Sequence, residues 1–311
     1  MNQKNISIAF LGTPEFALPS LNALAKAYHI GLVVTAPHDP KKGAPPVAHR
    51  AEGLGLLCAA PEKITPSLFA NTEFDFFVIA AYGKILPQEI LVIPTKGVLN
   101  IHPSLLPRYR GPSPVQSAIL AGDNESGVTI MLTDEKMDNG PILAQQKIPI
   151  EKKETSVSLT EKLADVGGEL IVRVIADYLS GTITPSPQNH EKASFTKLLR
   201  KNDGRIDWQK NAEYIERLVR AYLLWPTAWT YFKTTKSALR IKLLSADIGE
   251  EHENTIRPGH IQIKSGDLFV AASDRFLHIT ELQLEGKNTM SGREFIRGYI
   301  KGNDAAFLSD I

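Results

Sequence analysis

Asn100 and His102 are the residues whose types and spacing first point to chemistry. They close a strand-like run, residues 97–101 (GVLNI), and one residue separates them. Side chains two residues apart in an extended backbone point to the same face, so the amide and the imidazole can converge on one small substrate. The amide can hold a developing oxyanion, and the imidazole can exchange a proton near neutral pH. The pair predicts a site where an amine attacks a carbonyl carbon; the alternative is a histidine with a structural role at a strand end.

A carboxylate follows in residues 137–141 (MDNGP), between two strand-like runs. An acid beside a histidine can orient the ring and favour its charged form, or relay the proton of the amine to water. Asp138 is therefore the third candidate. The alternative is that Asp138 is a turn residue, because Asp, Asn and Gly commonly form turns.

Two loops beside predicted strands restrict the kind of site. After the first strand, residues 12–17 (GTPEFA) lack the three glycines that a dinucleotide pyrophosphate requires, and no P-loop pattern occurs. A nicotinamide or flavin cofactor is therefore disfavoured. The proline-rich residues 103–112 (PSLLPRYRGP) form either the wall of a pocket or a rigid crossover loop.

The first half of the chain alternates β-rich runs with stretches of helical periodicity. Such near-continuous apolar strands predict an α/β fold with a Rossmann-like, mostly parallel sheet covered on both faces. Ligands of such sheets bind beyond the carboxyl ends of the strands. The spacing of Ser158 and Glu161 predicts a capping box that opens a helix, and Gly181 is the predicted end of that helix. The predicted strands are 6–11, 30–35, 75–81, 97–101, 127–133 and 142–150.

The second half predicts a small β-barrel, because its short strand-like runs are broken by turns. Residues 182–204 between the halves are polar and irregular, as a linker would be. We thus predict a catalytic domain over 1–181, a linker over 182–204 and a C-terminal domain over 205–311. The predicted barrel strands are 228–233, 239–245, 260–264, 267–272 and 276–282.

Composition excludes several classes of protein. The 311 residues suit two domains of ordinary size. The 35 basic and 34 acidic residues leave a net charge of +1, so nucleic-acid binding must rest on local patches. The single cysteine, Cys58, cannot form an internal disulfide, and without clustered soft ligands we expect no metal site. No signal segment or long apolar run occurs, so we expect a cytoplasmic location.

Several segments together resemble the folate-dependent formyltransferase family, over nearly the whole chain. Residues 99–111 (LNIHPSLLPRYRG) are similar to the signature loop of the family, and Asp138 matches the position of its acidic residue. The other similar segments are 12–17 (GTPEFA), 81–87 (AYGKILP), 203–208 (DGRIDW), 220–226 (RAYLLWP), 258–259 (PG) and 290–295 (MSGREF).

The resemblance implies an enzyme that transfers the formyl group of 10-formyltetrahydrofolate. It implies a Rossmann-like catalytic domain followed by an OB-like barrel, with Asn100, His102 and Asp138 as the catalytic residues. The residues that it assigns to the folate pocket are Tyr82, Gly83, Ile85, Ser104, Leu105, Leu106 and Pro107.

The resemblance also implies the acceptor, which is the α-amine of initiator methionyl-tRNA, used in translation initiation. We expect the protein to be a monomer. The barrel half would help to hold the acceptor arm, and purine-pathway formyltransferases lack such a half. Residues 35–48 look several residues shorter than the basic loop of tRNA-acting members and lack its usual arginine. An amino-sugar nucleotide is therefore an alternative acceptor, and a noncatalytic folate- or RNA-binding protein is a second alternative. The basic residues expected to contact tRNA phosphates are Lys41, Lys42, Lys197, Arg200, Lys201 and Arg205.

Overall fold

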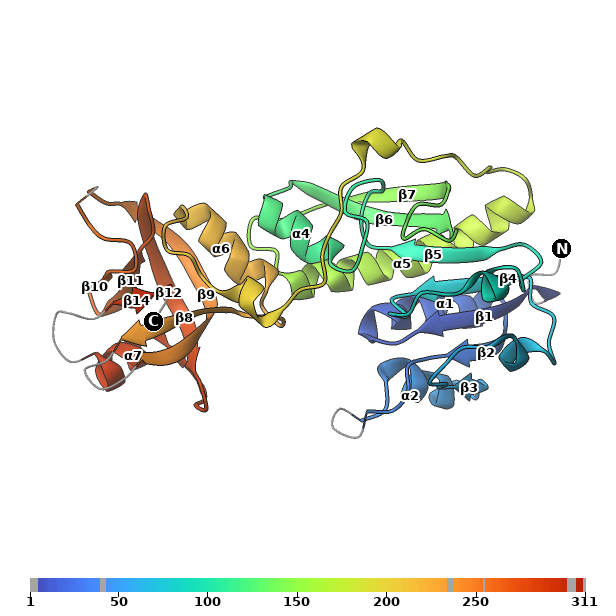
Figure 1. The fold of residues 1–311 in the computed structure, drawn as a ribbon, viewed down its shortest axis with the longest axis horizontal. Helices are drawn as coiled ribbons and strands as arrows, with labels where there is room; N and C mark the ends of the chain where they lie inside the picture. Colours follow the sequence, from blue (N-terminus) through green and yellow to red (C-terminus); the bar gives the residue numbers. More distant parts are fainter. Residues whose placement is uncertain (1–4, 40–42, 234–237, 254, 301–305, 310–311) are drawn as a thin grey trace. The chain divides into compact units, whose positions relative to one another are not determined.

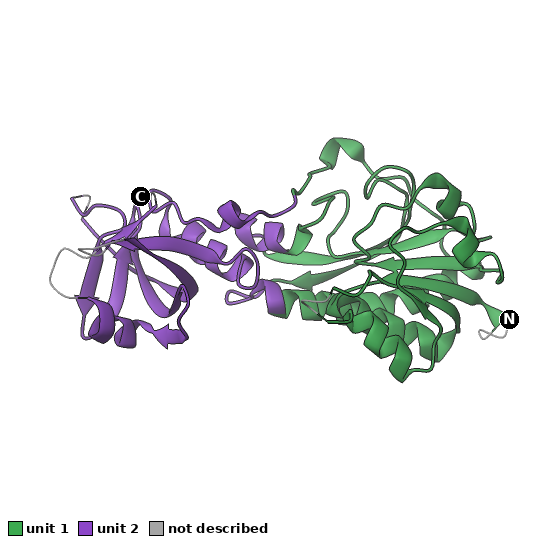
Figure 2. Ribbon diagram, turned by 60° about the horizontal axis from the view of Figure 1, so that its bottom comes forward, with its two compact units in different colours: residues 1–115, 124–150, 158–197 green, residues 116–123, 151–157, 198–311 purple. Residues whose placement is uncertain are grey.

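The chain forms two compact units, and each unit is assembled from three separate stretches of the sequence (Figure 2). A computed structural model describes residues 5–39, 43–233, 238–253, 255–300 and 306–309. The boundaries between the units pass through the first residues of two helices, α4 (Pro114–Ala121) and α5 (Ser156–Leu179). Unit 1 comprises Met1–Val115, Asn124–Ile150 and Ser158–Lys197, and unit 2 comprises Gln116–Asp123, Glu151–Val157 and Leu198–Ile311.

Unit 1 is built on a sheet with the strand order β3-β2-β1-β4-β5-β6-β7 (Figure 1). Strands β1 to β5 pair in parallel, and β6 and β7 are antiparallel to their neighbours. The predicted mostly parallel, Rossmann-like sheet is therefore confirmed. The strands are β1 (Ser7–Gly12), β2 (His29–Val34), β3 (Cys58–Ala59), β4 (Phe76–Ala80), β5 (Val98–His102), β6 (Glu125–Leu132) and β7 (Ile142–Pro149).

The strand order reverses at β1, which pairs with β2 on one side and with β4 on the other. Parallel strands β4 and β5 end at the same edge of the sheet, so the loops that follow them emerge side by side. Their register places Ile79 beside Asn100. This pairing brings two segments that are about twenty residues apart in sequence to one place, as a doubly wound sheet predicts.

Helix α5 packs closely on β5 and on α1 (Leu18–Ala27), and glycines make this approach possible. A Cβ on Gly167 would lie 2.8 Å from the side chain of Ile101, and one on Gly168 would lie 2.9 Å from the backbone of Pro19. Because Ile101 faces α5, its neighbours Asn100 and His102 face the other side of the sheet. The remaining helical segments of this part are η2 (Glu15–Ala17), α2 (Pro46–Gly53), η3 (Pro66–Phe69), α3 (Gln88–Leu91) and η4 (His190–Lys192).

Unit 2 contains an antiparallel sheet with the order β10-β11-β12-β9-β8-β14, to which β13 adds beside β12. Register shifts between β12 and β9 interrupt the ladder, and such bulges increase the bend and twist of a sheet. The sheet curls into a half-barrel, which confirms the predicted small OB-like barrel. Its strands are β8 (Ala228–Lys233), β9 (Ala238–Glu251), β10 (Ile261–Lys264), β11 (Asp267–Ala271), β12 (Arg275–Leu284), β13 (Thr289–Ser291) and β14 (Phe307–Leu308).

Aromatic rings fill the core of unit 2. Trp208, Phe232 and Phe295 pack around Phe307, with ring centroids 5.9 to 6.1 Å from that of Phe307. The indole N–H of Trp208 is buried and donates to Oγ1 of Thr230 at 3.0 Å, so the polar atom of the ring is satisfied. The helical segments that lie wholly within this unit are η5 (Lys201–Gly204), α6 (Ala212–Ala221) and α7 (Gly292–Tyr299).

Among the described residues, no helix combines the length and the apolar character that crossing a bilayer requires.

Candidate active site

A cavity of about 420 Å³ opens beside the ends of β4 and β5 in unit 1. Its volume lies within the range of small-molecule sites. Most of its lining comes from four segments: residues 81–86 after β4, residues 100–103 at the end of β5, Gly111, Pro112 and Pro114, and residues 133–138 from the β6–β7 connection. Ile79 and Met131 complete the lining. Asn100, His102 and Asp138 are all in its wall, so the structure brings the three candidate catalytic residues together.

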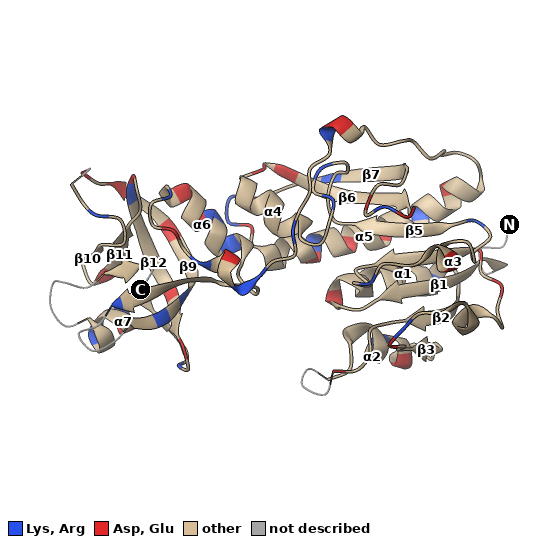
Figure 3. Cartoon of the chain, in the orientation of Figure 1, with Lys and Arg blue, Asp and Glu red and all other residues tan. Residues whose placement is uncertain are grey.

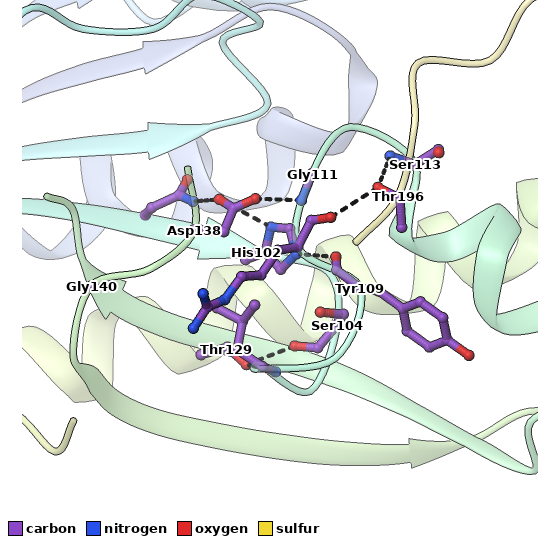
Figure 4. A network of polar contacts seen from close by, with 12 residues as sticks. His102, Ser104, Tyr109, Gly111, Ser113, Thr129, Asp138, Gly140 and Thr196 are labelled. Carbon is purple, nitrogen blue, oxygen red and sulfur yellow. Dashed lines mark hydrogen bonds and ion pairs between the residues drawn. The ribbon is translucent and has the colours of Figure 1, made fainter. Parts of the chain in front are cut away.

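His102 is held through both ring nitrogens (Figure 4). The ring is nearly buried, and Nε2 lies 3.0 Å from the carbonyl oxygen of Tyr109. A carbonyl oxygen can only accept, so Nε2 carries the hydrogen and donates it. Nδ1 lies 3.6 Å from Oδ1 of Asp138. In the neutral ring, Nδ1 is therefore the nitrogen with the free lone pair, and it faces the carboxylate.

The Asp138 carboxylate is fixed by two N–H donors. Oδ2 accepts from the backbone N–H of Gly111 at 2.7 Å, and Oδ1 accepts from Nδ2 of Asn100 at 3.4 Å. Asp138 adopts a left-handed backbone conformation with φ 50°. Residues that bear a side chain seldom take this conformation, although Asp and Asn tolerate it best. The acid thus sits in a constrained turn and also faces the histidine, so the turn-former and site interpretations of Asp138 are compatible.

The loop after His102 is fastened to β6 by Thr129. Its hydroxyl donates to the carbonyl of Ser104 at 2.6 Å and accepts from the N–H of Leu106 at 3.1 Å. Thr129 is fully buried, so these bonds satisfy polar groups that have no access to water. The carbonyl of Tyr109 that orients His102 belongs to the same loop.

The expected folate-pocket residues divide into two groups. Tyr82, Gly83 and Ile85 line the cavity. The segment 104–107 (Ser104, Leu105, Leu106 and Pro107) is not part of its wall. Ser104 and Leu106 are buried, and the Ser104 hydroxyl donates to the carbonyl of Arg108 at 2.7 Å within the turn. This segment therefore stabilises the loop that follows β5 and does not contact the cavity itself.

Tyr82 is buried with only 3% of its surface exposed, and it packs in the hydrophobic core next to the cavity. Burial raises the pKa of its phenol, so the side chain remains neutral at physiological pH. Ile85 and Met137 lie on two different lining segments and are 77% and 56% exposed. Exposed apolar side chains at the mouth of a cavity are surface that a bound ligand would cover.

The comparisons with known proteins agree over both units. Residues 6–175 match the family described as formyl transferase, and residues 198–300 match the formyl transferase C-terminal domain. Two curated relatives, from Thermodesulfovibrio yellowstonii and Roseiflexus castenholzii, are each named methionyl-tRNA formyltransferase and are each 41% identical to this chain. The alignments cover 94% of this chain, and 95% and 96% of the two relatives.

The chain belongs to the formyltransferase family.

A solved structure extends the likeness to the fold. The N-formyltransferase from Helicobacter canadensis, in complex with folinic acid and dTDP-3-aminofucose, matches this formyltransferase with a TM-score of 0.66 at 20% identity. The match covers 88% of this chain and 98% of the other. At this identity the likeness shows the shared architecture of the two proteins.

Lys and Arg residues occur in both units of the formyltransferase, interspersed with Asp and Glu (Figure 3). Four of the basic residues expected to contact tRNA are exposed: Lys197, Arg200, Lys201 and Arg205. Arg200, Lys201 and Arg205 lie within six consecutive residues of unit 2, and Lys197 is the last residue of unit 1. The other two expected residues, Lys41 and Lys42, lie outside the described residues.

The groups of the formyltransferase that orient the three side chains are not evident from its sequence. The carbonyl of Tyr109 and the N–H of Gly111 are backbone groups, which residue types cannot reveal. Thr129 carried a signal, because it is a hydroxyl within the apolar run 127–133. Among the described residues, no three His, Cys, Asp or Glu side chains are grouped as metal ligands.

We predict that neutral His102 exists as the tautomer with hydrogen on Nε2, because the Tyr109 carbonyl can only accept a hydrogen bond. Ring ¹⁵N NMR of the formyltransferase checks this, with a His102→Gln variant to assign the signals. A protonated-type shift at Nε2 and an unprotonated shift at Nδ1 are expected in the neutral ring. The reverse pattern would contradict the geometry of the site.

Proposed function

We propose that this formyltransferase moves the formyl group of 10-formyltetrahydrofolate to the α-amine of initiator methionyl-tRNA. The observation that carries the proposal is the convergence of Asn100, His102 and Asp138 on the wall of one cavity. The similarity to two methionyl-tRNA formyltransferases at 41% identity, over nearly the full length of each protein, supports the choice of acceptor.

The reaction exchanges one carbon–nitrogen bond for another. The amine attacks the formyl carbon, and a tetrahedral intermediate with a negative oxygen forms. The bond from that carbon to N10 of the folate then breaks. The amine loses one proton and N10 gains one, so the chain needs a donor for the oxyanion and a route for the proton.

Asn100 and His102 supply these two functions. Asn100 lines the cavity, and the second N–H of its amide, which is not used by Asp138, can donate to the oxyanion. One preorganised donor of this kind is worth about 10²–10³ in rate. The free lone pair on Nδ1 of His102 can accept the amine proton. Asp138, 3.6 Å away, compensates the positive charge that the ring then carries. Return of the proton to N10 completes the transfer.

The folate would lie along residues 81–86, against Tyr82, Gly83 and Ile85. This segment presents apolar surface together with backbone polar groups, as pockets for heteroaromatic ligands usually do. Ser104, Leu105, Leu106 and Pro107 support this pocket indirectly, since they fix the loop that continues to Tyr109 and Gly111.

The acceptor would be held by exposed basic side chains. Arg200, Lys201 and Arg205 concentrate positive charge on a chain whose net charge is only +1. An amino-sugar nucleotide remains the alternative acceptor, since the Helicobacter canadensis protein was solved with one. Its 20% identity to this chain, against 41% for the two methionyl-tRNA formyltransferases, favours tRNA. A noncatalytic folate- or RNA-binding role would leave the three converging polar side chains without a purpose.

Loss of a catalytic side chain should lower turnover without unfolding the chain. His102→Ala should reduce the rate by about 10²–10⁴, and Asn100→Ala by about 10²–10³. Asp138→Asn should be similarly damaging, because the shape survives while the negative charge is lost. Formyl transfer to charged tRNA measures these rates, with His29→Ala in β2 as an exposed control. Near wild-type turnover in a folded His102→Ala variant would remove His102 from the mechanism.

Binding of initiator tRNA should weaken steeply with salt, because phosphate contacts release counterions. The combined variant Lys197→Ala, Arg200→Ala, Lys201→Ala and Arg205→Ala should bind more weakly and lower the slope of log affinity against log salt by up to about three. A Lys63→Ala, Lys147→Ala variant at exposed positions outside the cluster is the control. Equal slopes for the wild type and the cluster variant would exclude this surface from tRNA binding.

A further inference from the structure

Gln188 is a buried side chain outside the cavity, and all of its hydrogen-bonding positions are used. Its Nε2 donates to the carbonyl oxygens of Asp138, at 3.0 Å, and Gly140, at 2.7 Å. Its Oε1 accepts from Nε of Arg110 at 3.2 Å and from Nη2 of the same guanidinium at 2.7 Å. Gln188 is only 5% exposed, although it belongs to residues 182–204, whose composition predicts a linker.

Arg110 is a buried cation with neutral partners. Besides Gln188, its guanidinium donates to Oδ1 of Asn139 at 3.1 Å and to Nδ1 of His190 at 2.9 Å. None of its hydrogen bonds to the described residues ends on a carboxylate. A buried charge without an opposite charge depends on well-placed dipoles. The guanidinium therefore fixes the orientation of the Gln188 amide, whose oxygen must face it and whose N–H groups must point away.

Those N–H groups point at the constrained turn that carries the catalytic carboxylate. Asp138 has a φ of 50°, and a side chain at Gly140 would overlap with the carbonyl of Leu132. Strained turns of this kind persist only when their surroundings determine them. Gln188 donates to the backbone carbonyl of Asp138 in this turn, and the N–H of Gly111 donates to the Asp138 carboxylate at 2.7 Å. The turn is thus held at its main chain and at its side chain.

We propose that Gln188, oriented by Arg110, is a positioning residue that aims the Asp138 carboxylate at Nδ1 of His102. The proposal rests on the proposed function, since it takes Asp138 as a member of the catalytic machinery. Gln188 does not line the cavity, so its effect on the reaction passes through Asp138. Residues 182–204, whose composition predicts a linker, therefore contribute a positioning residue to the site.

The substitution Gln188→Glu keeps the oxygen that accepts from Arg110 and removes the N–H groups that donate to the turn. The new carboxylate still accepts from Arg110, but it places oxygen against the carbonyls of Asp138 and Gly140. We expect kcat to fall about 10- to 100-fold, because small displacements of a reacting group carry costs of this size. KM for the folate should stay within about twofold of the wild-type value, because the substitution leaves the residues that line the cavity unchanged. Gln146→Glu is the matched control: Gln146 also accepts from an arginine, Arg173 at 3.2 Å, but lies on β7 away from the turn. It should retain wild-type kcat.

A double-mutant cycle decides whether Gln188 acts through Asp138. The cycle uses single-turnover conditions, under which slow rates remain measurable. In an Asp138→Asn background, Gln188→Glu should lower the rate of formyl transfer only slightly. If Gln188→Glu lowers the rate by the same factor in the wild type and in the Asp138→Asn variant, the proposal is overturned. Gln188 would then have only a general structural role. If Asp138→Asn alone keeps wild-type turnover, the proposed function of the site fails instead. Should Gln188→Glu not fold, Gln188→Met repeats the cycle with a neutral side chain of similar length, and the same two outcomes decide it.

Discussion

The site depends on one carboxylate held against one imidazole where little water reaches. The side chains of His102 and Asp138 are only 6% and 13% exposed, and Nδ1 and Oδ1 are 3.6 Å apart. Charges in such surroundings must find fixed partners, because water cannot supply them. The partners are the Tyr109 carbonyl for the ring and the Gly111 N–H for the acid. Both belong to residues 103–112, which explains why this proline-rich loop must be rigid and why Thr129 anchors it to β6.

Under the proposed function, the two compact units serve different needs of one reaction. All residues that line the cavity belong to unit 1, and the exposed basic residues of 200–205 belong to unit 2. Small-molecule chemistry needs a closed, preorganised pocket, whereas binding a polyanion needs exposed cations over an extended surface. Under the proposed function, the formyl donor and the acceptor amine meet in unit 1, while the body of the acceptor is held elsewhere.

Much of this arrangement could be read from the sequence, because alternation and apolar runs are local signals. The strands β1, β2, β4, β5, β6 and β7 lie within two residues of the predicted runs. The spacing of Asn100 and His102 correctly placed both on one face, and Asp138 joins them in the cavity wall. The two-residue strand β3 gave no such signal, since it is too short to show a period. The buried position of Gln188 was also hidden, because polar, proline-rich residues around it are typical of exposed linkers. Its burial follows from Arg110, 78 residues earlier, and such distant partners leave no local pattern.

The proposed acceptor of the formyl group is the amine of initiator methionyl-tRNA. The most direct measurement offers the enzyme 10-formyltetrahydrofolate with charged initiator tRNA and, separately, with an amino-sugar nucleotide, and compares kcat/KM for the two acceptors. We expect formylmethionyl-tRNA to accumulate with an equal loss of formyl donor, and the nucleotide to remain unformylated. Two results would contradict tRNA as the acceptor: formylation of the nucleotide while the charged tRNA stays unformylated, or formylation of neither.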